Sequence, residues 1–205
     1  MSYTLDLLKQ LADGLARQFG PDCEIVIHDL KKHDLEVCWE VVNNDSETMY
    51  FTIGGHPAFR VPVREGESQS DYRLAFEGLD TLTYLLIDTS VGTVLADEPH
   101  TLSLENGTCS IAPHMFDKDA LVFDNGQIQK AGILFPDGTP YLTLTSEGFP
   151  NFGIWSVPGA PFVCLEPWMG RCDDCGFEKP LSEKANINVL KPDEEFIKSY
   201  QITVH

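Results

Sequence analysis

After its N-terminal stretch, the chain is built almost entirely from short apolar or alternating segments that are separated by turn-forming residues. Segments of this length, rich in β-branched and aromatic residues and bounded by Gly, Pro, Asn and Asp, are typical of β-strands. Many short strands at regular spacing favour a β-sandwich or a barrel. The predicted strands are Cys23–His28, Leu35–Val42, Met49–Ile53, Tyr72–Phe76, Leu82–Ile87, Thr101–Leu104, Cys109–Ile111, Ala120–Phe123, Gln127–Leu134, Tyr141–Thr145, Phe152–Trp155, Phe162–Leu165, Ile187–Leu190 and Glu195–Val204.

Three reversals indicate how these strands pair. Asn106–Gly107 and Asn125–Gly126 supply the positive φ angles that two-residue hairpin turns require, and Pro136–Gly138 predicts a third reversal. Such turns imply antiparallel pairing. The segment Phe162–Leu165 is apolar on both faces, which predicts a buried strand with Glu166 at its end.

The first residues follow a different pattern. Apolar residues recur there at three- and four-residue steps, Thr4 can cap the start, and Gly20–Pro21 stops the run, so one amphipathic helix is predicted. We therefore expect a helix-strand segment at residues 1–33 and a β-domain at residues 34–205. The apolar residues of the helix are Leu5, Leu8, Leu11, Leu15 and Phe19.

The charge of the chain limits its partners. The 205 residues include 32 acidic and 14 basic side chains, which give a formal charge of −18. A chain with this charge repels nucleic-acid backbones and anionic membrane surfaces, so we expect neither as a partner. No apolar run approaches the ~20 residues of a membrane span, and the start lacks the basic region of a secretion signal. A cytoplasmic location is expected.

The six cysteines are expected to be reduced thiols, because a chain of this size needs no disulfides to fold. Cys172 and Cys175 have the spacing of half a zinc knuckle, but no second pair at ligand spacing follows. The sequence therefore predicts no metal site.

Two motifs far apart in the sequence carry residues suited to proton transfer. His56 lies in the glycine-tight segment Gly54–Phe59, and Glu166 lies between an apolar strand and Pro167–Trp168. A histidine and a carboxylate are the usual acid and base of enzymes that move protons. Two structural interpretations remain open, in which His56 only caps a turn and Glu166 only pairs with Arg171.

From about Leu35 to the C-terminus, the chain resembles the aldose 1-epimerases, the galactose mutarotase-like family, and most closely its branch associated with lactose and galactose operons. Four motifs carry the resemblance, FTIGGHPAF (51–59), DALVF (119–123), FGIWS (152–156) and VCLEPWMG (163–170). The resemblance implies an antiparallel β-sandwich of the galactose mutarotase-like type. Because the further strands with which this family normally begins have no match here, it implies an incomplete, N-terminally truncated sandwich that follows the helix. Residues 1–30 resemble the start of a PAS-like domain of bacterial transcriptional regulators.

The resemblance also implies a reaction, the interconversion of the α and β anomers of a free hexose by ring opening and reclosure. It assigns Glu166 as the general base on the anomeric hydroxyl and His56 as the general acid toward the ring oxygen. No cofactor or metal is required. Reference pKa values near ~4.3 for Glu and ~6.5 for His lead us to expect an ionised Glu166 and a His56 held protonated by a carboxylate.

Three further residues are candidates for sugar binding. By resemblance, Asp119 hydrogen-bonds sugar hydroxyls, although it could equally be a strand-start residue that accepts a turn amide. Trp168 could stack on a sugar, whereas Trp155 is expected in the core. Arg171 is the third candidate and, with Arg60, could instead recognise a phosphate.

Other functions remain open beside a mutarotase that acts on a hexose. One is a non-catalytic carbohydrate-binding remnant of the fold, because the missing strands would bring further contacts to the sugar. Another is a hexose-6-phosphate 1-epimerase. A regulatory protein is disfavoured, because the sequence shows no DNA-binding element or basic face. Truncation leaves an unpaired sheet edge, which predicts a homodimer through that edge.

Overall fold

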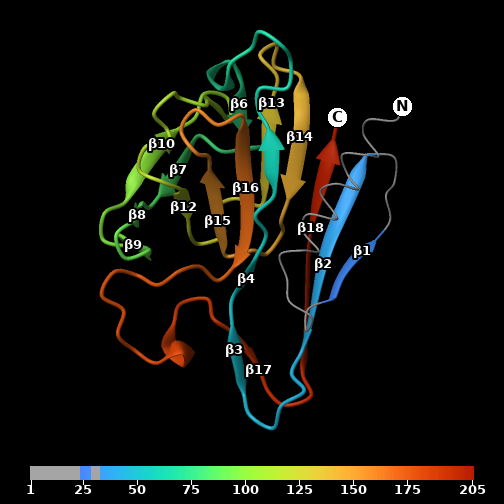
Figure 1. Cartoon of the computed structure of the whole chain (residues 1–205), viewed down its shortest axis with the longest axis vertical. Coiled ribbons are helices and arrows are strands. Elements are labelled where there is room, and N and C mark those ends of the chain that lie inside the picture. The colour runs from blue at the N-terminus through green and yellow to red at the C-terminus, as the bar shows by residue number, and fades with distance from the viewer. Residues whose placement is uncertain (1–23, 29–32) are drawn as a thin grey trace.

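The computed structural model describes residues 24–28 and 33–205, which form two β-sheets packed face to face (Figure 1). The order of strands in the larger sheet is β1-β2-β18-β14-β13-β6-β11. Their bounds are β1 (Glu24–His28), β2 (Asp34–Val42), β18 (Glu195–Val204), β14 (Pro140–Thr145), β13 (Lys130–Leu134), β6 (Arg73–Ala75) and β11 (Thr108–Ser110).

The smaller sheet has five strands, with β5 pairing onto β16 beside the path β12-β15-β16-β4. Their bounds are β12 (Leu121–Phe123), β15 (Asn151–Trp155), β16 (Phe162–Met169), β4 (Ile53–Gly54) and β5 (Ala58–Arg60). Three two-stranded ribbons complete the described strands, namely β10 (His100–Ser103) with β7 (Thr81–Tyr84), β17 (Asn188–Leu190) with β3 (Met49–Phe51), and β8 (Ile87–Asp88) with β9 (Thr93–Val94). Two short 3-10 helices, η1 (Gln69–Asp71) and η2 (Leu181–Glu183), lie in the connections.

The named strands pair antiparallel throughout. The predicted antiparallel sandwich is therefore confirmed. Alternation along β2 shows how the core forms, because Leu35, Val37 and Trp39 are fully buried while the residues between them face outward. These side chains meet Val163 and Leu165 of the smaller sheet in one apolar core. Burial of apolar surface between the two sheets is the main force that holds them together.

One of the three predicted hairpins is confirmed as such. Pro136–Gly138 joins β13 to β14, which pair antiparallel. Asn125 and Gly126 both have positive φ, as predicted, but they lead from β12 in the smaller sheet to β13 in the larger sheet. Asn106–Gly107 makes a local reversal closed by a Glu105–Thr108 bridge, again between strands of different sheets. The two Asn–Gly turns therefore reverse the chain as predicted, but the strands on either side of each turn do not pair with each other.

β16 is longer than the sequence predicted. It runs on to Met169, so Glu166 lies inside the strand and not at its end. Pro167 had indicated a strand end because it lacks an N–H. The strand tolerates it here because the Pro167 carbonyl still accepts a hydrogen bond from the Gly55 N–H at 2.9 Å. The consequence is that Glu166 is buried, with 4% of its surface exposed.

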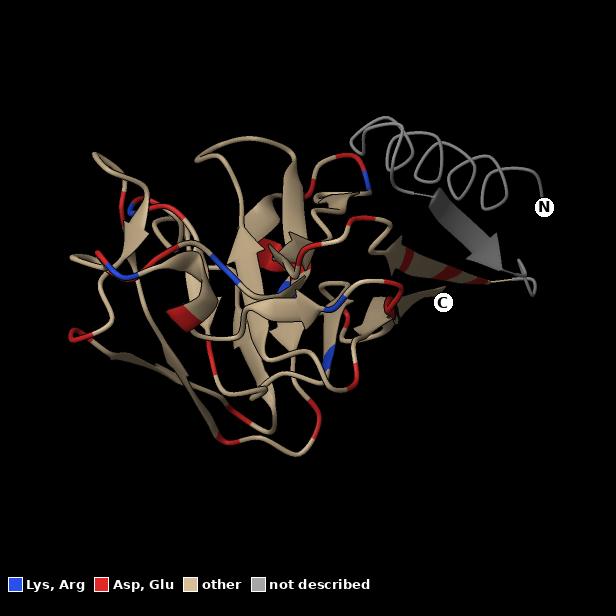
Figure 2. Ribbon diagram, turned by 90° about the horizontal axis from the view of Figure 1, so that it is seen from below, with Lys and Arg blue, Asp and Glu red and all other residues tan. Residues whose placement is uncertain are grey.

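The predicted N-terminal helix and Cys23, the first residue of the first predicted strand, lie outside the described residues, and the boundary between residues 33 and 34 stays a prediction. Within residues 24–28 and 33–205, no helix is both long and apolar enough to cross a membrane. Acidic side chains far outnumber basic ones and are spread over many loops of the described part (Figure 2). β1 and β11 form the two edges of the larger sheet. Pairing of two chains through such an edge stays a prediction, which light scattering at high protein concentration would test.

Candidate active site

His56 is held opposite Glu166 by two short strands that pair with β16 on either side of it. Gly54 of β4 is the register partner of Trp168, and Ala58 of β5 is the partner of Cys164. The segment between β4 and β5 therefore places His56 across from Glu166, the residue midway between those two partners. Segments 110 positions apart in the sequence are thus brought together by sheet register.

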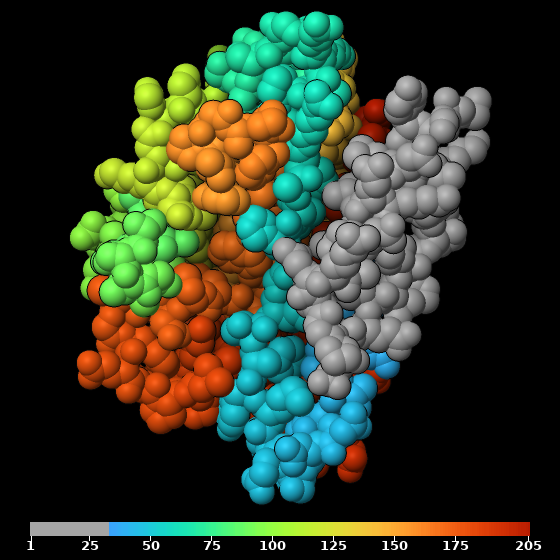
Figure 3. Space-filling view, viewed as in Figure 1, coloured from blue at the N-terminus to red at the C-terminus, as the bar shows by residue number. Residues whose placement is uncertain are grey.

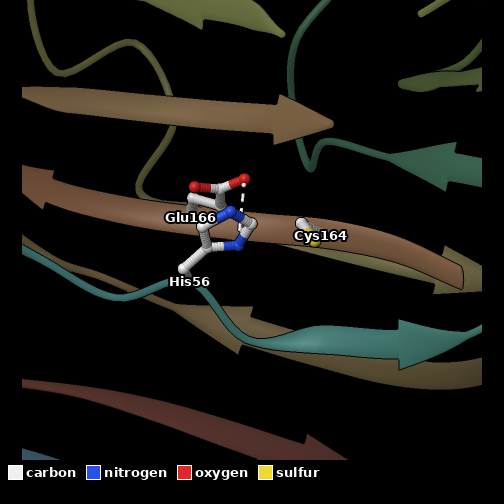
Figure 4. A group of neighbouring side chains, drawn as sticks. All are labelled: His56, Cys164 and Glu166. Atoms are coloured by element: carbon white, nitrogen blue, oxygen red, sulfur yellow. Dashed lines mark ion pairs between the residues drawn. The ribbon is translucent and has the colours of Figure 1, made fainter. Parts of the chain in front are cut away.

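The two side chains meet. His56 Nδ1 lies 3.4 Å from Glu166 Oε1 (Figure 4). The histidine side chain is 45% exposed and the carboxylate 5%. In the space-filling view, the segment around β16 (brown) is recessed between the teal segment that holds β4 and β5 and the green segment on the other side (Figure 3). A molecule from solvent can therefore reach the pair from the histidine side.

Two tryptophans flank the pair. The ring of Trp155 contacts the His56 ring edge-on, with centroids 5.6 Å apart. Trp155 was expected in the core, and it is partly buried and packs against a second, smaller apolar cluster while its ring also contacts His56. The indole of Trp168 lies flat across β16, over Gly54 on one side and Gly153 on the other. Glycine at those two positions leaves the room that the indole occupies.

Alanine at position 153 would test this packing. Its Cβ would overlap the six-membered ring of Trp168, so Gly153→Ala is expected to cost about 1–3 kcal/mol of stability. Chemical denaturation measures the change. The same substitution in a Trp168→Leu background should cost markedly less, because the smaller side chain vacates the space. Equal costs in both backgrounds would show that the indole does not occupy this space.

Asp119 stands close enough to act on Glu166. Its backbone has φ of 74°, a conformation that non-glycine residues rarely adopt. Its Oδ1 accepts a hydrogen bond from the Ala120 N–H at 2.7 Å, which matches the structural role left open for it. Its charge also raises the pKa of Glu166. Among residues 24–28 and 33–205, no hydrogen bond to its other carboxylate oxygen is found, so that oxygen can accept one.

The protonation of the pair differs from the expectation of an ionised Glu166 beside a protonated His56. Burial raises the pKa of Glu166 to about 8, against the lowering effect of the Trp168 side chain. Burial also lowers the pKa of His56. The sequence could not reveal these shifts, because it placed Glu166 at the end of the strand and not inside it. At neutral pH the two side chains therefore share one proton. The Glu166 carboxyl group holds this proton, and the His56 ring is neutral.

This shift predicts how stability depends on pH. The folded protein binds a proton at Glu166 between pH 4.5 and about 8, where the unfolded chain does not. The stabilisation from protonated Glu166 is therefore fully present below pH 4.5 and is lost as the pH rises to about 8, by up to about 5 kcal/mol. Urea denaturation over this range should show a smaller loss in Glu166→Gln than in the unmodified protein. Parallel curves for the two proteins would contradict the shift.

Arg171 does not join the pair. Its guanidinium donates to both oxygens of Asp124, at 2.9 and 2.8 Å, and to Asp174 at 2.8 Å. A further N–H donates to the carbonyl of Cys172 at 3.0 Å. The interpretation in which Glu166 merely pairs with Arg171 is therefore wrong. The guanidinium N–H groups already donate to two carboxylates and a carbonyl, so few of them can donate to a substrate.

A cavity of about 670 Å³ opens beside this network. Arg171, Asp124 and Lys184 line it together with polar loop residues, and Lys184 pairs with Asp173 at 2.8 Å. Neither His56 nor Glu166 is among the described residues that line this cavity. The cavity is thus separate from the pair, and its lining residues lie outside the strands of the smaller sheet.

Known proteins resemble this chain in sequence and in fold. LacX of Lactococcus lactis subsp. lactis, in plasmid and chromosomal forms, is 29% identical over 182 residues, 87% of this chain and 60% of LacX. A galactose mutarotase related enzyme from Lactobacillus acidophilus superposes with a TM-score of 0.77 at 27% identity, over 86% of this chain and 59% of that one. A galactose mutarotase-like protein from Lactobacillus casei gives 0.72 at 26% identity, over 86% and 60%.

The resemblance read from the four motifs is therefore confirmed, and the fold is of the galactose mutarotase-like type. The chain spans about 60% of the length of these relatives. A profile of the YheO-like PAS domain matches residues 1–47, in agreement with the PAS-like resemblance of the start.

Proposed function

We propose that the protein is an aldose 1-epimerase, which interconverts the α and β anomers of a free hexose. The 3.4 Å contact between His56 and Glu166, on a galactose mutarotase-like sandwich, carries this proposal. The reaction removes a proton from the anomeric hydroxyl and adds one to the ring oxygen, and both oxygens are bonded to one carbon. Two groups in contact can each reach one of these oxygens.

The proton count of the pair suits the reaction. Acid–base catalysis needs one group that holds a proton and one that lacks it, and this pair carries a single proton at neutral pH. Transfer of the proton from Glu166 to His56 gives the form in which Glu166 is the base and His56 the acid. Glu166 then accepts the anomeric proton while His56 protonates the ring oxygen. Rotation about C1–C2 and the reverse transfers yield the other anomer.

The surroundings of the pair favour a neutral sugar. Trp155 and Trp168 offer apolar faces for the C–H side of a pyranose, and Asp119 offers an acceptor for a hydroxyl. A phosphate clamp by Arg171 is disfavoured, because Asp124 and Asp174 already occupy that guanidinium. We therefore propose an unphosphorylated hexose, and not a hexose 6-phosphate, as the preferred substrate.

Polarimetry tests the proposal. Freshly dissolved α-galactose and α-glucose should reach anomeric equilibrium faster with the protein than in buffer alone, and glucose 6-phosphate should respond less. A folded sample that gives only the buffer rate on both free sugars would contradict the proposal.

A second candidate, a non-catalytic carbohydrate-binding protein, is favoured by the coverage of about 60% of the relatives' length. Fewer contacts around the sugar reduce the precision with which it is held, and poor positioning alone lowers rates by orders of magnitude. Saturation-transfer NMR that detects galactose binding, together with a mutarotation rate equal to the blank, would identify this function.

A further inference from the structure

A third potential ligand side chain lies beside the catalytic pair. Cys164 is two residues before Glu166 on β16, so both side chains project from the same face of the sheet (Figure 4). The Cys164 sulfur, a His56 ring nitrogen and a Glu166 oxygen all lie within 4.8 Å of one another. The sequence alone predicts only a place in an apolar strand for Cys164, because Val163 and Leu165 on either side of it are apolar.

The spacing of these three atoms suits a small divalent cation. A tetrahedral zinc site has metal–ligand distances near 2.0–2.3 Å, which puts its ligand atoms about 3.3–3.7 Å apart. The His56–Glu166 contact of 3.4 Å already has that separation. Closing the other two separations takes shifts within the reach of side-chain rotation, since all three atoms start within 4.8 Å.

The charge around the cluster also favours a cation. Among the described residues, no Lys or Arg forms an ion pair with Glu166, and the nearby charge that acts on it is the carboxylate of Asp119. A buried carboxylate is costly to ionise without a cationic partner, so a divalent ion that displaces the proton of Glu166 supplies the countercharge that the described residues do not. The side chain of His56 is 45% exposed, so an ion can enter from solvent on that side.

We propose that His56, Cys164 and Glu166 form a binding site for a thiophilic divalent cation of the Zn²⁺ class, with the fourth position open to solvent. One thiolate, one imidazole and one carboxylate are ligand types that zinc accepts, and three protein ligands with an open position are typical of exchangeable sites. On binding, the Cys164 thiol releases its proton to solvent and coordinates as thiolate.

The bound cation has a functional consequence, which rests on the proposed function whereas the binding itself does not. Coordination occupies the lone pairs that proton transfer uses, so micromolar zinc should inhibit mutarotation and a chelator should restore it. The site is thus inhibitory and not a cofactor site.

Co²⁺ serves as the probe, because a thiolate in a tetrahedral Co²⁺ site produces visible bands and a sulfur-to-metal charge-transfer band. Metal-free protein carrying Cys172→Ser and Cys175→Ser is the background, which removes the exposed cysteine pair that could bind cobalt itself. Titration of this background should produce the bands at one ion per chain, and Zn²⁺ should displace them.

Two variants decide the assignment. Cys164→Ser should abolish the charge-transfer band, and His56→Asn should weaken Co²⁺ binding by at least about tenfold. Cys109→Ser, a buried cysteine of the other sheet, is the matched control and should leave the bands unchanged. Bands that persist in Cys164→Ser, or that are absent from the background protein, would overturn the proposal. The readout needs no catalysis, so its failure is distinguishable from failure of the epimerase assignment.

Discussion

Glu166→Gln is expected to lower kcat for mutarotation by about 10²–10⁴-fold, the usual contribution of a general base or acid. The amide keeps the shape of the carboxyl group but cannot take up or release the proton that the reaction moves. Because Glu166 is buried on β16, the isosteric change leaves no cavity and should preserve the fold. His56→Asn should produce a loss of similar size, since the pair acts as a unit.

Matched controls separate this effect from general electrostatics. Glu105→Gln and His114→Asn change the same residue types at exposed positions, where the side chains are 84% and 85% exposed. Neither should change kcat by more than about twofold, because solvent screens the charge of so exposed a side chain. Stopped-assay polarimetry over a range of galactose concentrations measures kcat and KM for each variant. Retention of more than half of kcat by Glu166→Gln would refute its role.

Arg171→Met is expected to lower the free energy of unfolding by about 3–5 kcal/mol, because it breaks a buried ion-pair network. The side chain of Arg171 is 9% exposed, and its guanidinium neutralises Asp124 at 20% and Asp174 at 41% exposure. Methionine fills much of the volume but leaves the Asp124 carboxylate poorly solvated and without its two charge-assisted hydrogen bonds. The hydrogen bond that Asn151 of β15 donates to Asp124 at 2.7 Å is then the remaining side-chain bond to this carboxylate among the described residues.

The control for this prediction is a surface arginine with the same number of acidic partners. Arg64 pairs with Glu67 at 3.7 Å and with Asp137 at 3.3 Å, and its side chain is 47% exposed. Arg64→Met should therefore cost less than about 1 kcal/mol. Urea denaturation monitored by tryptophan fluorescence gives both values. A difference of less than 1 kcal/mol between the two variants would show that burial of the Arg171 network adds no stability.

The strands could be predicted from the sequence because the patterns that indicate them involve only a few neighbouring residues. Alternation in Leu35–Val41 and the hairpin of Pro136–Gly138 each depend on a few neighbouring residues, and the structure reproduces both. The change of sheet after Asn125–Gly126 depends on which apolar face β13 buries, which no local pattern specifies. The continuation of β16 through Pro167 depends on a hydrogen bond from Gly55, a residue more than 100 positions earlier.

The sequence predicted which residues form the candidate site, but not how deeply they are buried or what surrounds them. Motif resemblance selected His56 and Glu166, and sheet register brings them into contact. The burial that raises the pKa of Glu166 to about 8 follows from its place inside β16, which the sequence had put one residue beyond the strand. Cys164 and Trp155 looked like core residues because apolar and aromatic side chains in strands usually are. The residues next to them in the strands point into the core, whereas Cys164 and Trp155 lie on the opposite face of the sheet, beside His56.

Exchange of α- and β-galactose at equilibrium, followed by NMR magnetisation transfer between the two C1 protons, tests the central claim most directly. It measures ring opening without a chemical gradient or a coupled enzyme. We expect the protein to accelerate the exchange well above the buffer rate, and Glu166→Gln to return it to within a few per cent of that rate. Exchange that is equally fast in both proteins, or no faster than buffer with the unmodified folded protein, would contradict the claim that His56 and Glu166 move protons on a sugar ring.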